Sequence, residues 1–278
     1  MDIYQELTNL QKSNTPFVIV TVVDKEGHAP QIPGAKMVVG LKDRLFGTIG
    51  GGAIELLAIK EAVSMLEKKE SPKLQKYLLG EKNDILDSIE TGMVCGGKLT
   101  LFFESHAALD TIYIFGAGHV GQALVYHLSK LDFRIVVCDC RNECSNAIPG
   151  ADEVVIADYS KILEDKAVPE NSFFLIATHS HEFDFTVLRR IYKSKWTPKY
   201  IGAIASKKKA ETVLKRLSDE GLISNIDINK LYCPVGLKIG GTTPHEIAIS
   251  IIAEILSVKF EKTGNSHSRT NLNSTKMN

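Results

Sequence analysis

The pattern with the clearest chemistry is Gly116-Ala-Gly118-His-Val-Gly121, which follows a strand-like run at 111–115 and opens a helical pattern. In such a turn the first glycine permits a sharp change of direction, the second lets backbone approach a phosphate, and the third lets helix pack on strand. Free N–H groups and the positive dipole end at the helix start favour an anion. We therefore predict that Gly116, Gly118, His119 and Gly121 contact a phosphate-bearing cofactor. The alternative is a tight β–α turn without a ligand.

Polar side chains follow the neighbouring strand-like runs. Asp139 closes the next run, where a dinucleotide-binding fold places an acid that binds ribose. Thr178 and His179 end a later run, and Ser206 precedes the basic cluster 207–209. Because ligands lie at the carboxyl ends of parallel strands, we expect all four residues at the cofactor. Lysines at a helix start oppose the macrodipole, and an anion would relieve that cost, although a solvated helix start is the simpler reading of this cluster.

The N-terminal half offers two further motifs. Gly50, Gly51 and Gly52 precede Glu55 and a strongly helical segment, which suits either an anion or a turn that needs positive φ. Cys95 is followed by two glycines, which favours an accessible thiol that could bind a transition metal. Most isolated cysteines are inert core residues, so both readings stay open.

Alternation of strand-like and helical runs predicts a Rossmann-like α/β domain with a parallel sheet in the second half of the chain. The expected strands are 111–115, 134–139, 153–157, 173–178 and 199–204, and the expected helices are 119–131, 159–166, 183–195, 206–220 and 244–258. Strand ends of such a sheet meet at one edge, where the motifs described above would gather.

The first half predicts a small α+β domain. Expected helices are 2–12 and 54–69, and expected strands are 17–23, 36–41, 44–49 and 99–104. We therefore predict an N-terminal α+β domain over 1–108, a Rossmann-like domain over 109–260, and a polar, disordered tail over 261–278.

Composition narrows the class of protein. Lys+Arg and Asp+Glu both number 33, and this zero balance argues against a general nucleic-acid binder. We expect no membrane association, because no run approaches the roughly 20 apolar residues of a spanning helix. The polar N-terminal segment and an odd number of scattered cysteines indicate a cytoplasmic protein with reduced thiols. Cys138, Cys140 and Cys144 poorly match the spacing of structural zinc sites, and Cys138 is expected to pack in a strand.

Taken together, the motifs resemble the XdhC/CoxI family, the accessory proteins of molybdenum hydroxylases such as xanthine dehydrogenase. The matching segments are Gly27-His-Ala-Pro30 with Pro33-Gly34-Ala35, Gly47-Thr-Ile-Gly-Gly-Gly52-Ala-Ile-Glu55, Cys95-Gly-Gly97, Phe115-Gly-Ala-Gly-His-Val-Gly121, and Pro234-Val-Gly-Leu-Lys-Ile-Gly240 with Pro244-His-Glu246. Thr178-His179 with Asp184 also fits, and the resemblance covers about residues 15 to 258.

This resemblance implies a chaperone that binds the molybdenum cofactor, assists its sulfuration and inserts it into a xanthine dehydrogenase-type apo-enzyme. The implied partners are that molybdenum hydroxylase and a cysteine desulfurase, and a homodimer is expected. Carried onto this sequence, Cys95 becomes the candidate contact to molybdenum or sulfur. Gly50–Gly52 with Glu55, and the Gly116–Gly121 loop, become candidate cofactor-binding positions.

Several positions depart from the family's pattern. The departures are His28 for Ser, Gln31 for Arg, Ala205 for Gly, Lys207 and Lys208 for paired Arg, and Lys238 for an acid. Lysine keeps the charge of arginine but loses its bidentate recognition of phosphate. The competing hypothesis is an NAD(P)-dependent oxidoreductase, since the glycine fingerprint and Asp139 fit that chemistry as well. A dehydrogenase also needs a proton-transfer group near the nicotinamide, and the first half offers no compelling pair.

Overall fold

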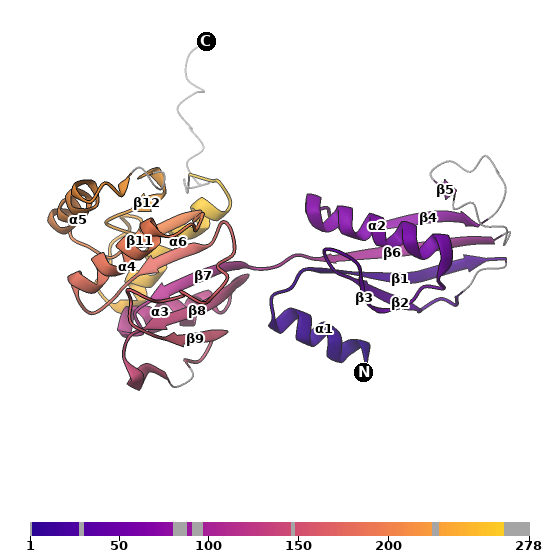
Figure 1. The fold of residues 1–278 in the computed structure, drawn as a ribbon, viewed down its shortest axis with the longest axis horizontal. Coiled ribbons are helices and arrows are strands. Elements are labelled where there is room, and N and C mark those ends of the chain that lie inside the picture. The colour runs from indigo at the N-terminus through magenta and orange to yellow at the C-terminus, as the bar shows by residue number, and fades with distance from the viewer. Residues whose placement is uncertain are drawn as a thin grey trace, which may run out of the picture. The chain divides into compact units, whose positions relative to one another are not determined.

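The computed structural model of the chain describes residues 2–27, 31–79, 88–90, 97–145, 148–223 and 228–263. The chain divides into two compact units, Met1–Ala108 and Leu109–Asn278, which we describe separately (Figure 1). None of the helices in the described ranges has the length and apolar character needed to cross a membrane. The disordered tail was predicted over 261–278, and residues 264–278 of it lie outside the described residues.

The first unit is built on a six-stranded sheet in the order β3-β2-β1-β6-β4-β5, antiparallel except for the β4–β5 pair. Its elements are α1 (Ile3–Lys12), β1 (Phe17–Glu26), β2 (Lys36–Val39), β3 (Arg44–Gly47), α2 (Gly52–Lys68), β4 (Lys73–Leu79), β5 (Ser88–Glu90) and β6 (Gly97–His106). Alternate residues of β1 pack on opposite faces: Val18 and Val20 lie in the cluster under α2, whereas Phe17 and Ile19 lie with Leu10 of α1.

This unit confirms the predicted α+β character but holds more strand than expected. β1 runs on to Glu26 instead of turning after Val23, with a bulge between Val22 and Asp24 in its pairing with β6. The sequence does not predict β4, because polar side chains such as the exposed Lys76 interrupt its apolar pattern.

The second unit is a six-stranded parallel sheet in the order β12-β11-β10-β7-β8-β9, as expected for a Rossmann-like domain. Its elements are β7 (Asp110–Phe115), α3 (His119–Leu128), β8 (Phe133–Asp139), η1 (Asn142–Ser145), β9 (Glu153–Ile156), β10 (Phe173–Ile176), α4 (His181–Lys193), β11 (Tyr200–Ala203), α5 (Lys207–Asp219), η3 (Ile228–Lys230), β12 (Leu231–Tyr232) and α6 (Pro244–Lys259). The chain adds β8 and β9 on one side of β7 and then places β10 on its other side, so the order of the strands reverses at β7.

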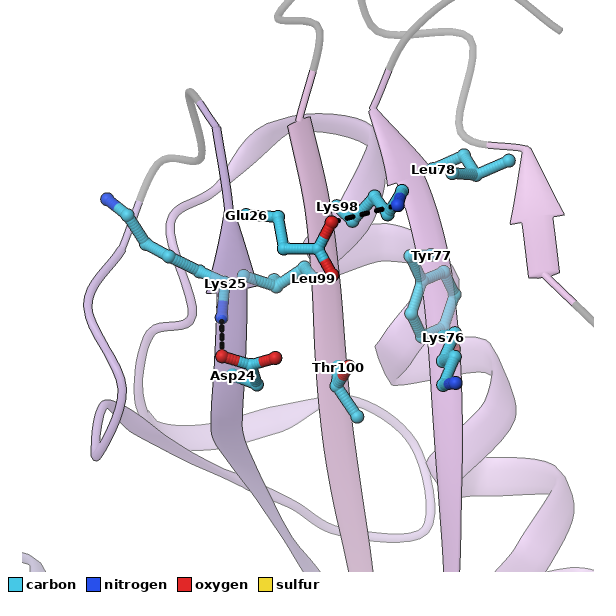
Figure 2. Close-up of a pocket in the computed structure, with 9 residues that line it drawn as sticks. All are labelled: Asp24, Lys25, Glu26, Lys76, Tyr77, Leu78, Lys98, Leu99 and Thr100. Carbon is cyan, nitrogen blue, oxygen red and sulfur yellow. Dashed lines mark hydrogen bonds and ion pairs between the residues drawn. The ribbon is translucent and has the colours of Figure 1, made fainter. Parts of the chain in front are cut away.

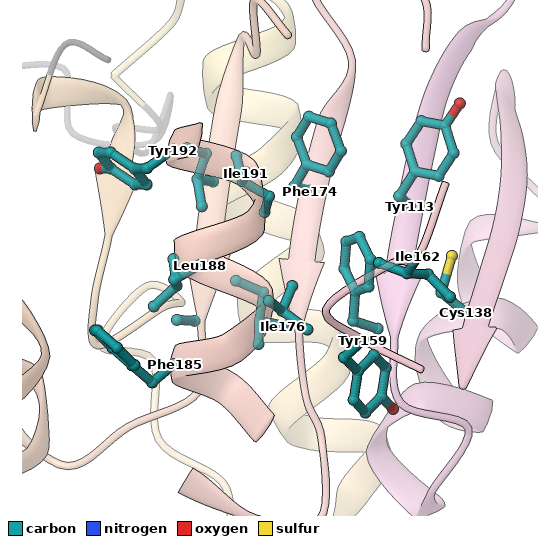
Figure 3. Packing of buried hydrophobic residues seen from close by; sticks show 14 of the residues in the cluster. Tyr113, Cys138, Tyr159, Ile162, Phe174, Ile176, Phe185, Leu188, Ile191 and Tyr192 are labelled. Carbon is teal, nitrogen blue, oxygen red and sulfur yellow. The ribbon is translucent and has the colours of Figure 1, made fainter. Parts of the chain in front are cut away.

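Both faces of this sheet are covered. Tyr113 and Phe115 of β7 belong to the cluster that includes α4, shown in Figure 3, whereas Ile112 and Ile114 belong to the cluster of α3 and α6. Burial on both faces explains the continuous apolar runs of these strands. Cys138 is fully buried in the first of these clusters, which confirms its predicted packing role.

One predicted helix is absent. Residues 159–166 form a run of turns, and Leu163 has a positive φ of 59°. Tyr159, Ile162 and Leu163 are all buried, so the helix-like spacing of their side chains reflects three contacts with the core. A short segment of consecutive turns can make the same contacts as a helix, and the spacing of apolar residues alone does not distinguish a helix from such turns.

α6 is fixed at both ends. At its start, the Thr243 side chain accepts from the backbone N–H of Glu246, and the Glu246 carboxylate accepts from the backbone N–H of Thr243. At its end, Lys259 donates to the carbonyl of Asp132 at 2.8 Å and pairs with Asp110 at 3.0 Å. Because Asp110 begins β7, the end of α6 lies at the amino edge of the parallel sheet.

Candidate functional site

The glycine fingerprint forms a tight turn at the carboxyl end of β7. A Cβ atom at Gly116, whose φ is +115°, would lie 2.2 Å from the carbonyl oxygen of Ala177. A Cβ atom at Gly121 would lie 2.0 Å from the carbonyl oxygen of Gly116. Gly118 differs: its φ is −74°, and nothing lies within 4 Å of the position that its Cβ would take. Two glycines are therefore required by packing, and the middle one borders open space.

The helix behind this turn has no side-chain cap. Gly118 is the N-cap residue of α3 and, having no side chain, makes no capping hydrogen bond. The first N–H groups of a helix have no partner within it and need water, a side chain or a ligand. His119, the first helical residue, is exposed. The open space at Gly118 and the uncapped helix start together form a cradle suited to an anion.

Asp139 lies beside this turn, but its carboxylate is fully buried. It accepts from the backbone N–H of Ala117 at 2.8 Å and from the backbone and guanidinium of Arg141 at 2.9 to 3.0 Å. Burial alone would raise the pKa of Asp139, but these hydrogen bonds and the Arg141 charge outweigh it and lower the pKa to about 2. We therefore correct the expectation of a ribose-binding acid: protein donors surround Asp139, and it holds the glycine turn in place.

The end of β10 meets the same turn. Thr178 adjoins Gly116, since a Cβ atom at Gly116 would lie 3.1 Å from the Cα atom of Thr178. The Thr178 hydroxyl donates to Asp184 Oδ1 at 2.6 Å, and its backbone N–H donates to the same oxygen at 3.2 Å. His179 is exposed and rests edge-on against Phe183, with ring centroids 5.0 Å apart. The structure thus brings Thr178 to the glycine turn and shows no comparable contact for His179 in the described residues.

The end of β11 leads into α5. Ser206 is the N-cap residue, yet its side chain makes no capping hydrogen bond. Lys207 and Lys208 are exposed in the first turn, and Lys209 Nζ contacts the His181 ring of α4. A pocket bounded by α4 and α5 adjoins these residues, and Asp184 lines it. Sequence reasoning did not select Asp184 as a site residue, although its position six residues after Thr178, in the first turn of a helix, was a usable signal.

The glycine run of the first unit is organised differently. Gly50, Gly51 and Gly52 all have positive φ, at 119°, 72° and 68°. The buried carboxylate of Glu55 accepts from the backbone N–H groups of Ile49 and Gly51, both at 3.1 Å. These contacts decide between the two readings that the sequence left open, in favour of a turn that requires positive φ.

Glu55 has two further partners. The Thr48 hydroxyl donates to it at 2.5 Å, and Arg44 Nη1 donates at 2.7 Å. Burial alone would raise the pKa of Glu55, but the hydrogen bonds and the Arg44 charge outweigh burial, and the pKa lies below its ordinary value. We therefore reassign Glu55 from cofactor contact to an internal anion that occupies its own loop.

Cys95, the candidate metal contact, lies outside the described residues. Within the described ranges, no group of three or more His, Cys, Asp and Glu side chains is placed to hold a metal ion. Burial is the first cause of the raised pKa of both Cys140 and Cys144, so neither thiol is activated as a thiolate.

The two units match sequence families separately. Residues 112–255 match the family described as the XdhC Rossmann domain, and residues 10–77 match the XdhC and CoxI family. This chain belongs to the XdhC/CoxI family. All predicted site residues except Cys95 lie within these two ranges. Cys95 falls between them.

Curated relatives include three bacterial proteins. The chain is 32% identical over 95% of its length to the uncharacterized Escherichia coli protein YqeB, and 27% identical over 57% to a probable xanthine dehydrogenase subunit of Bacillus subtilis. It spans about half the length of both, 47% and 46%. It is 23% identical to the Escherichia coli molybdenum cofactor insertion chaperone PaoD, over 88% of this chain and 84% of that protein.

A solved structure shares the fold. A Bacillus halodurans protein described as a xanthine dehydrogenase aligns over 96% of this chain and 98% of its own, with 22% identity and a TM-score of 0.50. At this level of identity, the likeness to this XdhC/CoxI chain shows the fold alone.

The described residues of this XdhC/CoxI chain form two further pockets. One borders the glycine turn at Ala117 and runs beside Gln122 and Tyr126 of α3, with a volume of about 380 Å³. The other lies on β1, β6 and β4 of the first unit, where Glu26 and Lys98 pair at 2.8 Å (Figure 2). None of the predicted site residues lines the pocket in Figure 2.

Proposed function

We propose that this XdhC/CoxI-family chain binds the molybdenum cofactor and serves as an accessory protein for a xanthine dehydrogenase-type molybdenum hydroxylase. Two relatives support the proposal by their names: one is a probable subunit of xanthine dehydrogenase, and the other is a molybdenum cofactor insertion chaperone. The cofactor is a cargo in this role, and the chain needs to hold it and release it.

The observation that carries the proposal is the open cradle at Gly118. The pterin of the molybdenum cofactor bears a phosphate, and a phosphate fits an uncapped helix start that borders free space. Thr178 extends this edge toward the pocket bounded by α4 and α5, which offers room for the remainder of the ligand.

The finer parts of the proposal rest on the family resemblance. We expect the chain to protect the cofactor while a cysteine desulfurase supplies sulfur to the metal, and then to deliver it to the apo-hydroxylase. Cys95 remains the predicted thiol contact in this process, and Cys95→Ser should weaken binding of the sulfurated cofactor. A homodimer is expected and can be checked by light scattering.

A binding experiment tests the proposal. Cofactor released from a molybdenum hydroxylase would be titrated anaerobically into the wild-type chain, Gly118→Ala and Lys130→Ala. The added methyl of Gly118→Ala enters the space meant for the phosphate and should weaken binding roughly 10-fold, the scale of a lost charge-assisted hydrogen bond. Lys130 is exposed beyond the opposite end of α3, and its variant should bind as wild type. Equal binding by all three proteins would refute the proposed site.

The oxidoreductase hypothesis loses support from Asp139. A dehydrogenase of this fold uses the acid at that position to bind the ribose, and here protein donors surround the buried carboxylate. NADH titrated into the same proteins is the direct comparison. Saturable NADH binding with hydride transfer would replace the chaperone proposal.

A further inference from the structure

A pocket opens in the second unit where α4 and α5 begin, beyond the ends of β10 and β11. Its lining includes Asp184 and Leu188 from α4, Val213 from α5, and Ala203 at the end of β11. Its volume is about 200 Å³, below the range of pockets that enclose a whole drug-sized ligand. The pocket is therefore suited to one fused ring system of a larger ligand.

Asp184 supplies the pocket's buried acceptor. Its exposed fraction is 8%, and Oδ1 already accepts two hydrogen bonds from Thr178. Oδ2 lies 3.6 Å from Nδ1 of the exposed His181, which is within ion-pair distance but long for a hydrogen bond. Apart from this long contact with His181, Oδ2 keeps acceptor capacity for a donor that enters the pocket.

The remaining lining fits a flat heterocycle with polar edges. Leu188, Ala203 and Val213 provide apolar surface, and Cys233 adds a thiol whose pKa is raised to about 11 by burial and by the Asp184 charge. That thiol stays protonated and uncharged near neutral pH. Charged side chains also line the pocket, and two of them, Glu182 and Arg216, pair with each other. Asp184 is the buried carboxylate of the lining, and a buried acceptor favours a ligand that presents N–H donors to it.

We propose that this pocket receives the edge of a fused 2-amino-4-oxopyrimidine ring, with Asp184 Oδ2 accepting its N–H donors. The inference rests on the proposed function, because the pterin of the molybdenum cofactor presents this edge. Guanine presents the same edge, so the experiment includes both rings. Thr178 joins the two halves of the site, since it adjoins Gly116 and bonds to Asp184. A ligand whose phosphate lies at Gly118 would extend past Thr178 to place its ring in the pocket.

Matched ligands isolate the amino group. The fluorescent compound 6-hydroxymethylpterin would be titrated into the full chain beside 6-hydroxymethyllumazine, which carries an oxygen in place of the 2-amino group, and beside guanosine. The wild-type chain should prefer the pterin over the lumazine by ~100-fold, because the lumazine turns an acceptor toward a buried carboxylate. In Asp184→Asn the preference should fall to about 2-fold or less, since an amide can donate to the lumazine oxygen.

Asp165→Asn is the control variant, because Asp165 is exposed and does not line the pocket. It should keep the wild-type preference, and the fluorescence of Trp196 in the second unit verifies that each variant is folded. If guanosine binds and Asp184→Asn abolishes this binding, the edge recognition is supported, and the order of the two affinities identifies the source of the ring.

The outcomes separate this inference from the proposed function. Equal binding of pterin and lumazine by the wild-type chain, or an unchanged preference in Asp184→Asn, would overturn the inference even if the whole cofactor binds tightly. Failure of the whole cofactor to bind, with the pterin preference intact, would instead refute the proposed function and leave the ring recognition standing.

Discussion

The two units each hold a glycine-rich turn that leads into a helix, and each turn contacts a buried carboxylate paired with an arginine. In the first unit Glu55 accepts from the backbone N–H groups of Ile49 and Gly51. In the second, Asp139 accepts from one backbone N–H of the turn, that of Ala117. The first turn therefore carries its own anion, whereas the second keeps an open helix start at Gly118.

The difference follows from where the acid lies in the chain. Glu55 is in the first turn of the helix that the glycines begin, so its side chain folds back over their N–H groups. Asp139 ends the neighbouring strand and approaches the turn from the side. A glycine-rich helix start is therefore a stronger indication of a ligand when the first helical turn contains no acid, as in α3.

The largest expected effect tests whether packing requires the last glycine of the second turn. Gly121→Ala places a methyl 2.0 Å from the carbonyl oxygen of Gly116, where only backbone movement can relieve the clash. We expect the second unit to lose about 4 kcal/mol, a value typical of severe core substitutions. Urea unfolding followed by Trp196 fluorescence reports this unit, since the chain has one tryptophan. A loss below about 1 kcal/mol would contradict the packing argument.

Removing each arginine in turn compares the two carboxylates. Arg141→Met leaves the fully buried Asp139 without its countercharge and should cost about 3 kcal/mol. Arg44→Met should cost about 1 kcal/mol or less, because Arg44 is 45% exposed and Glu55 keeps its other donors. Far-UV circular dichroism in urea follows both units, with Trp196 fluorescence assigning the second. Similar losses for the two variants would show that the carboxylates are held alike.

Acid unfolding separates the contribution of Asp139 from that of Asp184. The folded pKa of Asp139 is about 2 against an ordinary 3.8, so its contribution is present above pH 4 and lost as pH falls toward 2. This loss corresponds to about 2 kcal/mol. Burial raises the pKa of Asp184, so its protonation on acidification is favoured by folding and works in the opposite direction. Asp139→Asn should abolish the loss in Trp196 fluorescence measurements between pH 4 and 2.5, and an unchanged loss would assign it to other groups.

The smallest effects compare the middle glycines of the two turns. Both Gly51 and Gly118 have free space around a Cβ position, but Gly51 has a φ of 72° with a ψ of −172°. Gly51→Ala should therefore cost about 2 kcal/mol in backbone strain. Gly118→Ala adopts an ordinary φ and should change the free energy of unfolding by about 0.5 kcal/mol or less. Comparable losses in the two variants would contradict the claim that φ sets the cost at these positions.

Much of the second unit could be predicted from the sequence. Its central strands are buried on both faces, so continuous apolar runs mark them clearly, and Gly116 lies where the pattern placed it. β12 was missed because a two-residue strand carries no periodicity. The turns at 159–166 were read as a helix because buried side chains at helical spacing do not reveal the backbone path.

The roles of the Asp139 and Glu55 carboxylates could not be predicted as well as the strands. Asp139 was identified at the correct strand end, but only the fold shows that Arg141 and Ala117 supply its hydrogen bonds. The same holds for Glu55, whose partners include a residue 11 positions earlier in the chain. Hydrogen bonds between separate elements depend on packing, which one sequence does not display.

The end of α6 is held at the amino edge of the parallel sheet. Lys259 ties the last turn of that helix to Asp110 and Asp132, which precede the bodies of β7 and β8. Phe260, which follows the last turn of α6, therefore lies on the side of the second unit that is remote from Gly118. An affinity tag or fluorophore added after Phe260 would leave the cargo's route of approach clear, and surface immobilisation through that position would present the cradle to solution.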